Sequence, residues 1–446
     1  MKKLDMIIKR CSVLSPHMEV VKDQSIGIQG NRIVIIDSEH EVETQYTATE
    51  MVDGYGKIAM PGLTDGHMHT CQHFLRGGTA DEYPMVWSRI LVPFESALDE
   101  DDVYASARLC ATEMIKHGTT SFAESGGPLI HAAAPAYLES GMRGRLAYSI
   151  MDQGAAIPDS MKDSIENLIE KTEKLYQEYH GSGNDRIKVF FGLRQILTCS
   201  SELIKLSGER ARALDTGVHI HLEEHRDEVK FCLQNFQMRP VDYLESLDLL
   251  GPNLIAAHSV LMTDHEIKKV AEKRVNAIHC PRSNLSSHGF PRTPTLLEAG
   301  ASVGLGTDGA AGSNMDVFQE MKIIRSAIRA AYGIPLFDPV ALPAREILRM
   351  VTQGGANAMM LGDSAGVLAP GKLADIILLN VDQSHLSPSL NYINTIVDCA
   401  NGTDVSDSII DGKLVMKNRE VLVFDEEEVK AEARKHAEKV WKKAFA

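Results

Sequence analysis

The chain has 446 residues, of which 44% are hydrophobic and 24% charged, and its formal net charge is −15. These values are ordinary for a globular protein and leave room for one large domain with a smaller one. The acidic balance, with no basic patch along the sequence, argues against a nucleic-acid partner.

The N-terminus and the cysteines bear on where the protein works. The opening segment, MKKLDMIIKR, lacks the apolar core of a signal peptide. No apolar run reaches the ~18 residues that a membrane helix needs. The seven cysteines are scattered, odd in number and without a CxxC pair, unlike a disulfide framework. We therefore expect a cytoplasmic protein that does not contact membranes.

The two ends of the chain share one sequence pattern, short strand-like runs separated by turn residues. Residues 1–57 contain short strand-like runs separated by Gly, Asn and Asp, and residues 362–424 return to that pattern with LADIILLN, INTIVDCA and DSIIDGKLVMKN. Asp411–Gly412 is a hairpin signal. We expect these segments to pair into one discontinuous β-sandwich. Residues 425–446 predict a helix, with acidic residues in its first turn and lysines in its last.

The middle of the chain, residues 58–361, alternates strand-like runs with amphipathic helix-like stretches. Eight such runs occur in order: KIAMPGLTDGHMH, TTSFAESG, GRLAYSIMD, IKVFFGLR, GVHIHLEE, NLIAAHSV, VNAIHCPRSN and ASVGLGTDG. Strands alternating with helices indicate an α/β protein with a parallel sheet. Eight units predict a (β/α)8 TIM barrel, whose active site lies at the C-terminal ends of the strands.

The first of these runs ends in His67-x-His69. On a strand, residues i and i+2 point to one face, so both imidazoles can aim at one point. An isolated His-x-His is as readily a pair of polar turn residues. Its place at the mouth of the first predicted barrel strand favours metal ligation.

A second His-x-His, His219 and His221, lies in the fifth run. His221 is nearer the predicted mouth, so we expect it to be a ligand and His219 to line the barrel with a hydrogen bond. Glu224 follows within reach of a substrate, although spacing alone does not separate it from Glu223.

The last three runs also end in polar residues. His258 ends the sixth, where a mouth position favours a functional role over that of a core histidine. His279 ends the seventh and is open between a supporting and a structural role. Asp308 follows the eighth. There GLGTDG matches the dinucleotide fingerprint G-x-G-x-x-G only weakly, because it falls on the last unit and carries an anion where a pyrophosphate would bind.

Three imidazoles and one carboxylate suit Zn²⁺, Fe²⁺ or Mn²⁺ with water left on the metal. A bound divalent cation lowers the pKa of water from 15.7 toward ~7, so hydroxide is available at neutral pH. The set therefore favours hydrolysis over binding alone.

Several segments together resemble the metal-dependent amidohydrolase superfamily: PGLTDGHMHT, HIHLEE, AAHSV, HCPRSNL, LLEAGASVGLGTDG and GVLAPGKLADIILL. The similarity spans about residues 50–380 and is greatest to the branch of cytosine, guanine and S-adenosylhomocysteine deaminases and triazine chlorohydrolases. The resemblance implies one divalent metal ion, Zn²⁺ first, with four ligands: His67, His69, His221 and Asp308.

The resemblance also assigns chemistry. It points to Glu224 rather than Glu223 as the general acid that protonates a ring nitrogen and the departing amine. Asp308 accepts the water proton, and His258 contacts the substrate or the attacking water. The implied reaction is hydrolytic deamination of a nitrogen heterocycle, which gives a ring carbonyl and ammonia.

Candidate substrate contacts lie after the first and the fourth predicted barrel strands. Adenosine-type deaminases of this superfamily carry a Trp and a ribose-binding Glu after the first strand. Trp87 matches, and Glu95 matches if one residue is deleted. In place of their Gly-Pro-His, this chain has Arg194 and Gln195 after Gly192-Leu193. Arg194 suits a carbonyl or anionic edge, or a salt bridge across the barrel mouth, and Gln195 suits an amide-like edge.

These departures favour a small oxo-bearing heterocycle: an oxopurine, a pterin or a pyrimidine. The alternatives are a methylthioadenosine/S-adenosylhomocysteine-type deaminase, an s-triazine chlorohydrolase, and a non-catalytic metal- or ligand-binding barrel. We expect a small-molecule substrate and water as the partners. The sequence leaves the oligomeric state open, with a homodimer as one alternative.

Overall fold

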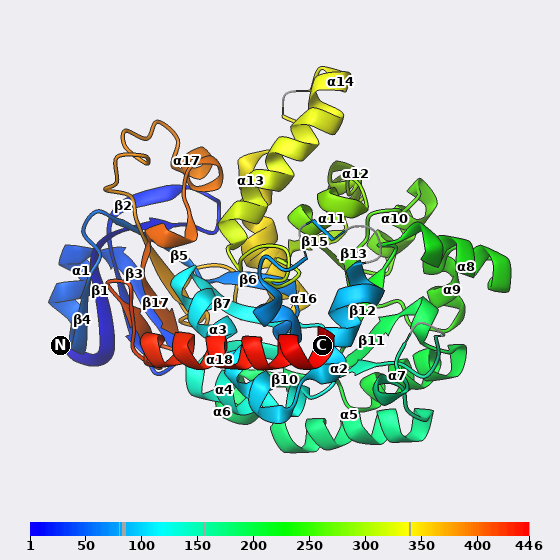
Figure 1. The fold of residues 1–446 in the computed structure, drawn as a ribbon. Helices are drawn as coiled ribbons and strands as arrows, with labels where there is room; N and C mark the ends of the chain where they lie inside the picture. Colours follow the sequence, from blue (N-terminus) through cyan, green and yellow to red (C-terminus); the bar gives the residue numbers. More distant parts are fainter. Residues whose placement is uncertain (80, 83–85, 155–156, 339, 446) are drawn as a thin grey trace.

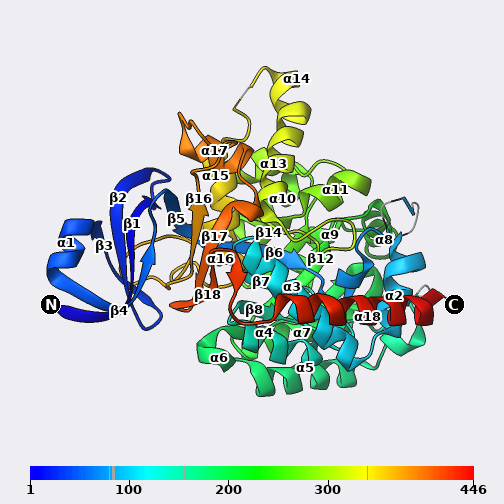
Figure 2. The same cartoon turned by 60° about the vertical axis from the view of Figure 1, so that its left-hand side comes forward.

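The structure is a computed structural model that describes residues 1–79, 81–82, 86–154, 157–338 and 340–445. A strand-rich part formed by both ends of the chain lies beside a larger part in which strands alternate with helices (Figures 1 and 2). None of the helices within the described ranges is both long and apolar enough to cross a membrane. All seven cysteines are free.

The strand-rich part is one nine-stranded sheet. It runs in the order β19-β18-β17-β16-β5-β1-β2-β3, with β4 also paired to β1. Its N-terminal strands are β1 (Lys2–Leu14), β2 (Val20–Gln29), β3 (Arg32–Ser38), β4 (Tyr46–Asp53) and β5 (Lys57–Pro61). Its C-terminal strands are β16 (Ile376–Asn380), β17 (Val405–Ile410), β18 (Lys413–Lys417) and β19 (Glu420–Val421). The two segments therefore share one sheet, because β5 pairs antiparallel with β16.

Alternating inward side chains from both segments form the core of this sheet. Ile8, Ile26, Ile376 and Leu378 are fully buried in one hydrophobic cluster. The hairpin expected at Asp411–Gly412 joins β17 to β18, and both residues have positive φ, as the turn requires.

Two sequence expectations about this part are wrong. INTIVDCA is not a strand but α17 (Tyr392–Asp398). The Asn391 side chain accepts a hydrogen bond from Asn394 N at 3.1 Å, and this N-cap favours the helix over the β-branched composition. KIAMPGLTDGHMH is likewise not one strand. It divides into β5 and β6 (Leu63–Met68) at Gly62, where a Cβ would lie 2.1 Å from Thr120 Oγ1.

Among its described residues, the larger part contains ten parallel strand segments. Besides β6 they are β7 (Thr119–Glu124), β8 (Arg143–Leu146), β9 (Ser149–Ile150), β10 (Ile187–Val189), β11 (Phe191–Gln195), β12 (Val218–Leu222), β13 (Leu254–His258), β14 (Asn276–His279) and β15 (Ser302–Leu305). They form a four-stranded sheet, β10-β8-β7-β6, and a six-stranded sheet, β15-β14-β13-β12-β11-β9.

The third and fourth predicted strands are each divided between these two sheets. GRLAYSIMD supplies β8 and β9, and IKVFFGLR supplies β10 and β11. The remaining edge strands of the two sheets are β6 and β15. Asp308 N, just after β15, donates to His67 O in β6 at 2.9 Å, which links the last strand to the first.

Helices follow the strands and cover them. The main ones are α3 (Glu100–Lys116), α4 (Ala134–Ser140), α5 (Ile165–Tyr179), α7 (Ser201–Ala213), α8 (Arg226–Phe236), α9 (Pro240–Ser246), α10 (Asp264–Glu272), α11 (Pro281–Ser287), α12 (Thr293–Glu298), α13 (Val317–Ile328) and α15 (Ala344–Arg349). Local signals begin them: at α10, Thr263 and Glu266 form a reciprocal capping box.

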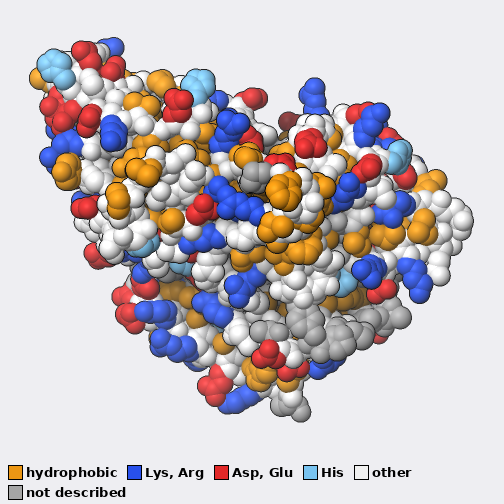
Figure 3. All heavy atoms as spheres, turned by 90° about the horizontal axis from the view of Figure 1, so that it is seen from above, with side chains coloured by type: hydrophobic (Ala, Val, Ile, Leu, Met, Phe, Trp, Pro, Cys, Tyr) orange, Lys and Arg blue, Asp and Glu red, His pale blue; other side chains and the backbone are white. Residues whose placement is uncertain are grey.

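The shorter helical elements lie between these. They are α1 (Glu39–Gln45), η1 (Thr70–Leu75), η2 (Trp87–Leu91), α2 (Val92–Ala97), η3 (Ile130–Ala132), η4 (Asp159–Met161), α6 (Ser182–Asp185), η5 (Ile196–Thr198), η6 (Arg329–Gly333), α14 (Ile334–Leu336), η7 (Met350–Gly354), α16 (Gly355–Ala358) and η8 (Gly402–Asp404). The α14 segment projects from the top of the molecule (Figure 1). Seen from above, hydrophobic side chains gather near the middle of this face (Figure 3).

The predicted C-terminal helix is α18 (Glu426–Phe445), drawn in red in Figure 1. It packs along α3 and α2. Ion pairs reinforce this contact: Arg108 Nη1 lies 2.6 Å from Glu432 Oε2, and Lys439 Nζ lies 2.8 Å from the buried Asp102 Oδ1.

Candidate metal and active site

The two histidines of the first triplet meet at the C-terminal end of β6. His67 lies within the strand and His69 directly after it, and their ring centroids are 5.0 Å apart. The backbone of Gly306 passes close by, since a Cβ there would lie 2.7 Å from His67 N. The glycines Gly306 and Gly309 of GLGTDG thus allow the backbone to approach His67 and His69 closely.

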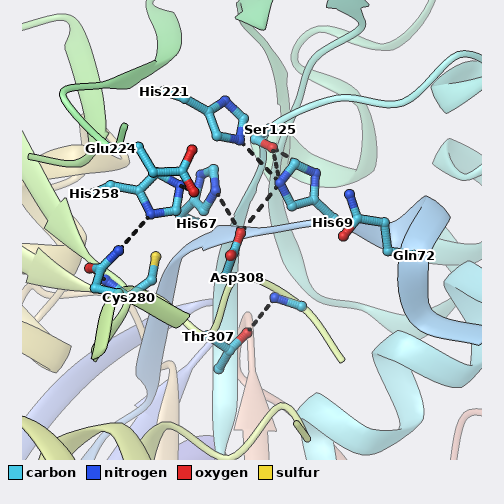
Figure 4. Close-up of polar contacts among 12 residues, drawn as sticks. His67, His69, Gln72, Ser125, His221, Glu224, His258, Cys280, Thr307 and Asp308 are labelled. Atoms are coloured by element: carbon cyan, nitrogen blue, oxygen red, sulfur yellow. Dashed lines mark hydrogen bonds and ion pairs between the residues drawn. The ribbon is translucent and has the colours of Figure 1, made fainter. Parts of the chain in front are cut away.

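Asp308 faces both histidines. Its Oδ1 lies 3.1 Å from His67 Nε2 and 3.4 Å from His69 Nε2. Figure 4 shows the three side chains converging, with His221 above them. The His221 Nε2 lies 3.2 Å from that of His69. The structure therefore brings together the four residues predicted as metal ligands.

Other polar groups fix these ligands. His219 Nε2 lies 2.8 Å from His67 Nδ1, so His219 orients His67 from behind. Ser125 Oγ lies 3.0 Å from His69 Nδ1. The buried Asp65 accepts hydrogen bonds from Thr307 N at 2.9 Å and Thr307 Oγ1 at 2.6 Å. These bonds fix the position of Thr307, which precedes Asp308 in the chain.

The electrostatics suit a cation. Burial lowers the pKa of His67 to about 3 despite its bond to Asp308, and burial also holds the pKa of His221 well below its usual value. Burial would raise the pKa of Asp308, but hydrogen bonds from His67 and His69 and the charge of His258 hold it well below its usual range. Neutral imidazoles beside an ionised carboxylate are the protonation states that a divalent metal ion needs.

The distances between the candidate ligand atoms also suit a metal ion. Two overlapping groups have ligand atoms that all lie within 4.8 Å of one another: His67, His69 and Asp308, and His67, His221 and His258. Nitrogen and oxygen donors of this kind bind zinc at about 2.0–2.2 Å.

The candidate acid and its partner lie next to this group. Glu224 Oε1 is 3.7 Å from His258 Nε2. His258 Nδ1 lies 3.0 Å from Asn284 Nδ2, and its carbonyl accepts from His279 Nδ1 at 2.8 Å. Asn284 therefore sets the ring orientation of His258, and His279 supports its backbone.

The two glutamates after β12 point in different directions. Glu223 turns away to Arg239 Nη2 at 3.2 Å, and its burial raises its pKa to about 10. Glu224 faces the histidines (Figure 4). Burial would raise the pKa of Glu224, but His258, His288 and His225 lower it.

Two of the predicted substrate contacts, Glu95 and Arg194, lie in a second buried cluster. Glu95 Oε1 accepts from Gln72 Nε2 at 2.6 Å and lies 3.7 Å from Arg194 Nη1. The Arg194 guanidinium lies over the Trp87 ring, 5.5 Å from its centroid. The salt-bridge alternative for Arg194 therefore holds. Gln195 ends β11, half buried, beside His221 in the strand register.

Sequence reasoning missed four supporting residues: Asp65, Gln72, Ser125 and Asn284. Gln72 had a signal, because it follows His69 by three residues and returns to the same side within η1. Asn284 lies in the middle of α11, five residues beyond His279. Its contact with His258 depends on tertiary folding that spacing does not reveal.

The chain matches the model of the amidohydrolase family over residues 58–415 and belongs to that family. It is 37% identical to the 5-methylthioadenosine/S-adenosylhomocysteine deaminase of Pelotomaculum thermopropionicum over 421 residues, 94% of each chain. It is also 37% identical to the 5'-deoxyadenosine deaminase of Methanothermobacter thermautotrophicus over 418 residues, 92% of this chain and 93% of the relative.

Solved structures of other proteins share the fold of this chain. An adenosine deaminase from Xanthomonas campestris with bound zinc is similar with a TM-score of 0.93 and 27% identity, covering 99% of both chains. An atrazine chlorohydrolase from Arthrobacter aurescens with zinc has a TM-score of 0.88 at 23% identity over 97% of this chain and all of its own, which shows the shared fold. The protein is a hydrolytic deaminase of the amidohydrolase family and acts on C–N bonds.

Proposed function

We propose that this protein deaminates adenosine nucleosides altered at the 5' position. The observation that carries this is near-full-length identity of 37% to deaminases of methylthioadenosine, S-adenosylhomocysteine and 5'-deoxyadenosine. The departures at Arg194 and Gln195 favoured a smaller oxo-bearing heterocycle, but the relatives support the adenosine-type alternative better. Arg194 is paired with Glu95, so it need not bind a carbonyl or anionic edge of the substrate. This weakens the main argument against an adenosine-type substrate.

We further propose a closed (β/α)8 barrel over about residues 62–361, with the nine-stranded sheet as a separate discontinuous domain. The hydrogen bond from Asp308 N to His67 O supports closure between the last and first strands. The boundary shifts from residue 58 to the end of β5, because that strand pairs within the nine-stranded sheet.

The four residues His67, His69, His221 and Asp308 would hold one metal ion, and zinc fits best given the zinc-bound adenosine deaminase of similar fold. When bound, such an ion supplies a water of lowered pKa as the nucleophile. Asp308 accepts a proton from this water. His219 keeps the Nε2 of His67 directed at Asp308 through its 2.8 Å contact with Nδ1.

Glu224 is the general acid. It takes one proton from the attacking water and gives it to the ring nitrogen beside the amino-bearing carbon, which makes that carbon electrophilic, and the proton held by Asp308 then passes to the departing amine. Water adds its oxygen to the ring carbon, the C–N bond breaks, and the products are a ring carbonyl and ammonia. His258, held by Asn284, stabilises the charge that develops on the added oxygen.

The buried cluster around Glu95 would take the ribose. Glu95 is 1% exposed, and its Oε2 has no hydrogen-bond partner within the described ranges. A buried carboxylate oxygen without a donor is costly, and vicinal ribose hydroxyls would supply donors. Gln72 links this cluster to the metal site, because it follows His69 and binds the other oxygen of Glu95.

Ammonia release tests the proposal. Purified protein of measured metal content is assayed with 5'-methylthioadenosine, S-adenosylhomocysteine, 5'-deoxyadenosine and adenosine, and with guanine, a pterin, cytosine and a chlorotriazine. We expect the highest kcat/KM for an adenosine nucleoside. A higher value for guanine or a pterin would restore the smaller-heterocycle alternative. Chloride release without ammonia would point to dechlorination, and no turnover of any compound would favour a binding protein.

A further inference from the structure

A second group of metal-ligating side chains lies at the outer side of the proposed acid. Glu224, His225 and His288 offer ligand atoms that all lie within 4.8 Å of one another. They come from two segments, the loop after β12 and the end of α11. The group shares no residue with the four proposed zinc ligands, so it is a separate cluster.

Its distances match those of a tetrahedral site. The Nε2 atoms of His225 and His288 are 2.9 Å apart, and His288 Nε2 lies 3.6 Å from Glu224 Oε1. Ligands at 2.0–2.1 Å in tetrahedral geometry are separated by about 3.3 Å. The two measured distances lie on either side of this value, so a small side-chain movement would complete the coordination.

The protonation states also suit a cation. Burial lowers the pKa of His288 to about 4, although Glu224 acts to raise it. The His288 side chain is 8% exposed and that of Glu224 17%, while His225 lies at the surface. The cluster therefore extends from the acid toward solvent, where an ion can enter.

We propose that Glu224, His225 and His288 form a second, weaker zinc site whose occupation inhibits the enzyme. Two imidazoles and one carboxylate are a common zinc donor set, and three protein ligands leave a position for water. The inhibitory effect rests on the proposed function of Glu224. If Glu224 is bound to an ion it can no longer take up a proton and pass it to the substrate, so turnover stops while the first metal stays in place.

The site is tested by counting metal ions. Holoenzyme is equilibrated with increasing free Zn²⁺, and bound zinc is measured by mass spectrometry. We expect saturation at two ions per chain in wild type and at one in His225→Gln and in His288→Gln. His265→Gln is the matched control: His265 also pairs with a carboxylate, Asp242, at 3.1 Å, but belongs to none of the metal-ligating groups found in the described ranges.

A second measurement separates the site from the role of Glu224. Excess Zn²⁺ is expected to inhibit wild type and His265→Gln, and to leave His225→Gln active. Equal zinc stoichiometry in wild type and both cluster variants would overturn the proposal. A second ion that binds wild type and His265→Gln but neither cluster variant, yet leaves turnover unchanged, would support the site and contradict the assignment of Glu224 as the acid.

Discussion

The carboxylate of Asp65 holds the segment that carries Asp308, and Asp65→Ala tests how much the metal site depends on it. The substitution removes the acceptors of Thr307 N and Thr307 Oγ1, bonded at 2.9 and 2.6 Å. Each buried donor left without a partner costs about 1–3 kcal/mol, so we expect a loss of roughly 2–6 kcal/mol in the free energy of unfolding. Groups that support metal ligands typically contribute 10–100-fold to metal affinity, so Zn²⁺ binding should weaken by about that factor.

Urea unfolding of the metal-free protein and competition for Zn²⁺ with a chelating dye measure the two effects. Thr307→Val is the matched control. It removes the hydroxyl, which donates to Asp65 at 2.6 Å and accepts a longer bond from Gly309 N at 3.2 Å, and it keeps the backbone bond to Asp65, so its loss should be about 1–3 kcal/mol. Asp65→Ala protein with unfolding free energy within about 0.5 kcal/mol of wild type and unchanged zinc affinity would refute the reasoning.

Three further outcomes are expected. Glu224→Gln should lower kcat by about 10²–10⁴ with metal content unchanged. Glu223→Gln is the control and should keep most of the activity, because the Glu223 side chain faces Arg239. Equal losses of kcat in the two variants in steady-state assays would contradict the assignment of Glu224 as the acid. Glu95→Gln should lower kcat/KM for nucleosides roughly 10- to 100-fold and spare free bases, if ribose binds there. Burial lowers the pKa of His279 from 6.5 to about 4, so the folded state binds fewer protons than the unfolded state. The stability from neutral His279 is present above pH 6.5 and falls by about 2 kcal/mol from pH 7 to pH 5, and His279→Gln should remove this part of the acid sensitivity in urea unfolding.

The sequence predicted the part of the site that depends on local geometry. Period-two spacing placed His67 and His69 on one face, and strand ends gave His221, His258 and Asp308. These positions follow from backbone regularity, which a single sequence carries. The bond of Asn284 to His258 and the pairing of Arg194 with Glu95 join residues 26 and 99 positions apart. Such contacts are set by packing of several elements, and spacing alone does not reveal them.

The fold shows the same division. Alternating runs predicted parallel strands separated by helices, and both ends of the chain were expected to join. The wrong predictions concern two short segments, INTIVDCA and KIAMPGLTDGHMH. α17 forms because Asn391 caps it, against the β-branched composition of INTIVDCA. The strand β6 begins only after KIAMP, and Gly62 separates it from β5 at a point where a Cβ would lie 2.1 Å from Thr120 Oγ1.

Four non-glycine residues at the edge that carries the site adopt a left-handed backbone conformation. Glu223, His258, Ser259 and Asp308 have φ of 51°, 70°, 51° and 61°, a left-handed conformation that costs non-glycine residues of order 1–3 kcal/mol. Hydrogen bonds hold it: Ser259 N donates to Leu222 O at 2.9 Å, and Asp308 N donates to His67 O at 2.9 Å. Each residue ends or follows a strand. A left-handed residue there turns the chain sharply, so that a side chain such as Asp308 faces the centre while the chain leaves for the next helix. The strain and the convergence of ligands therefore have one cause.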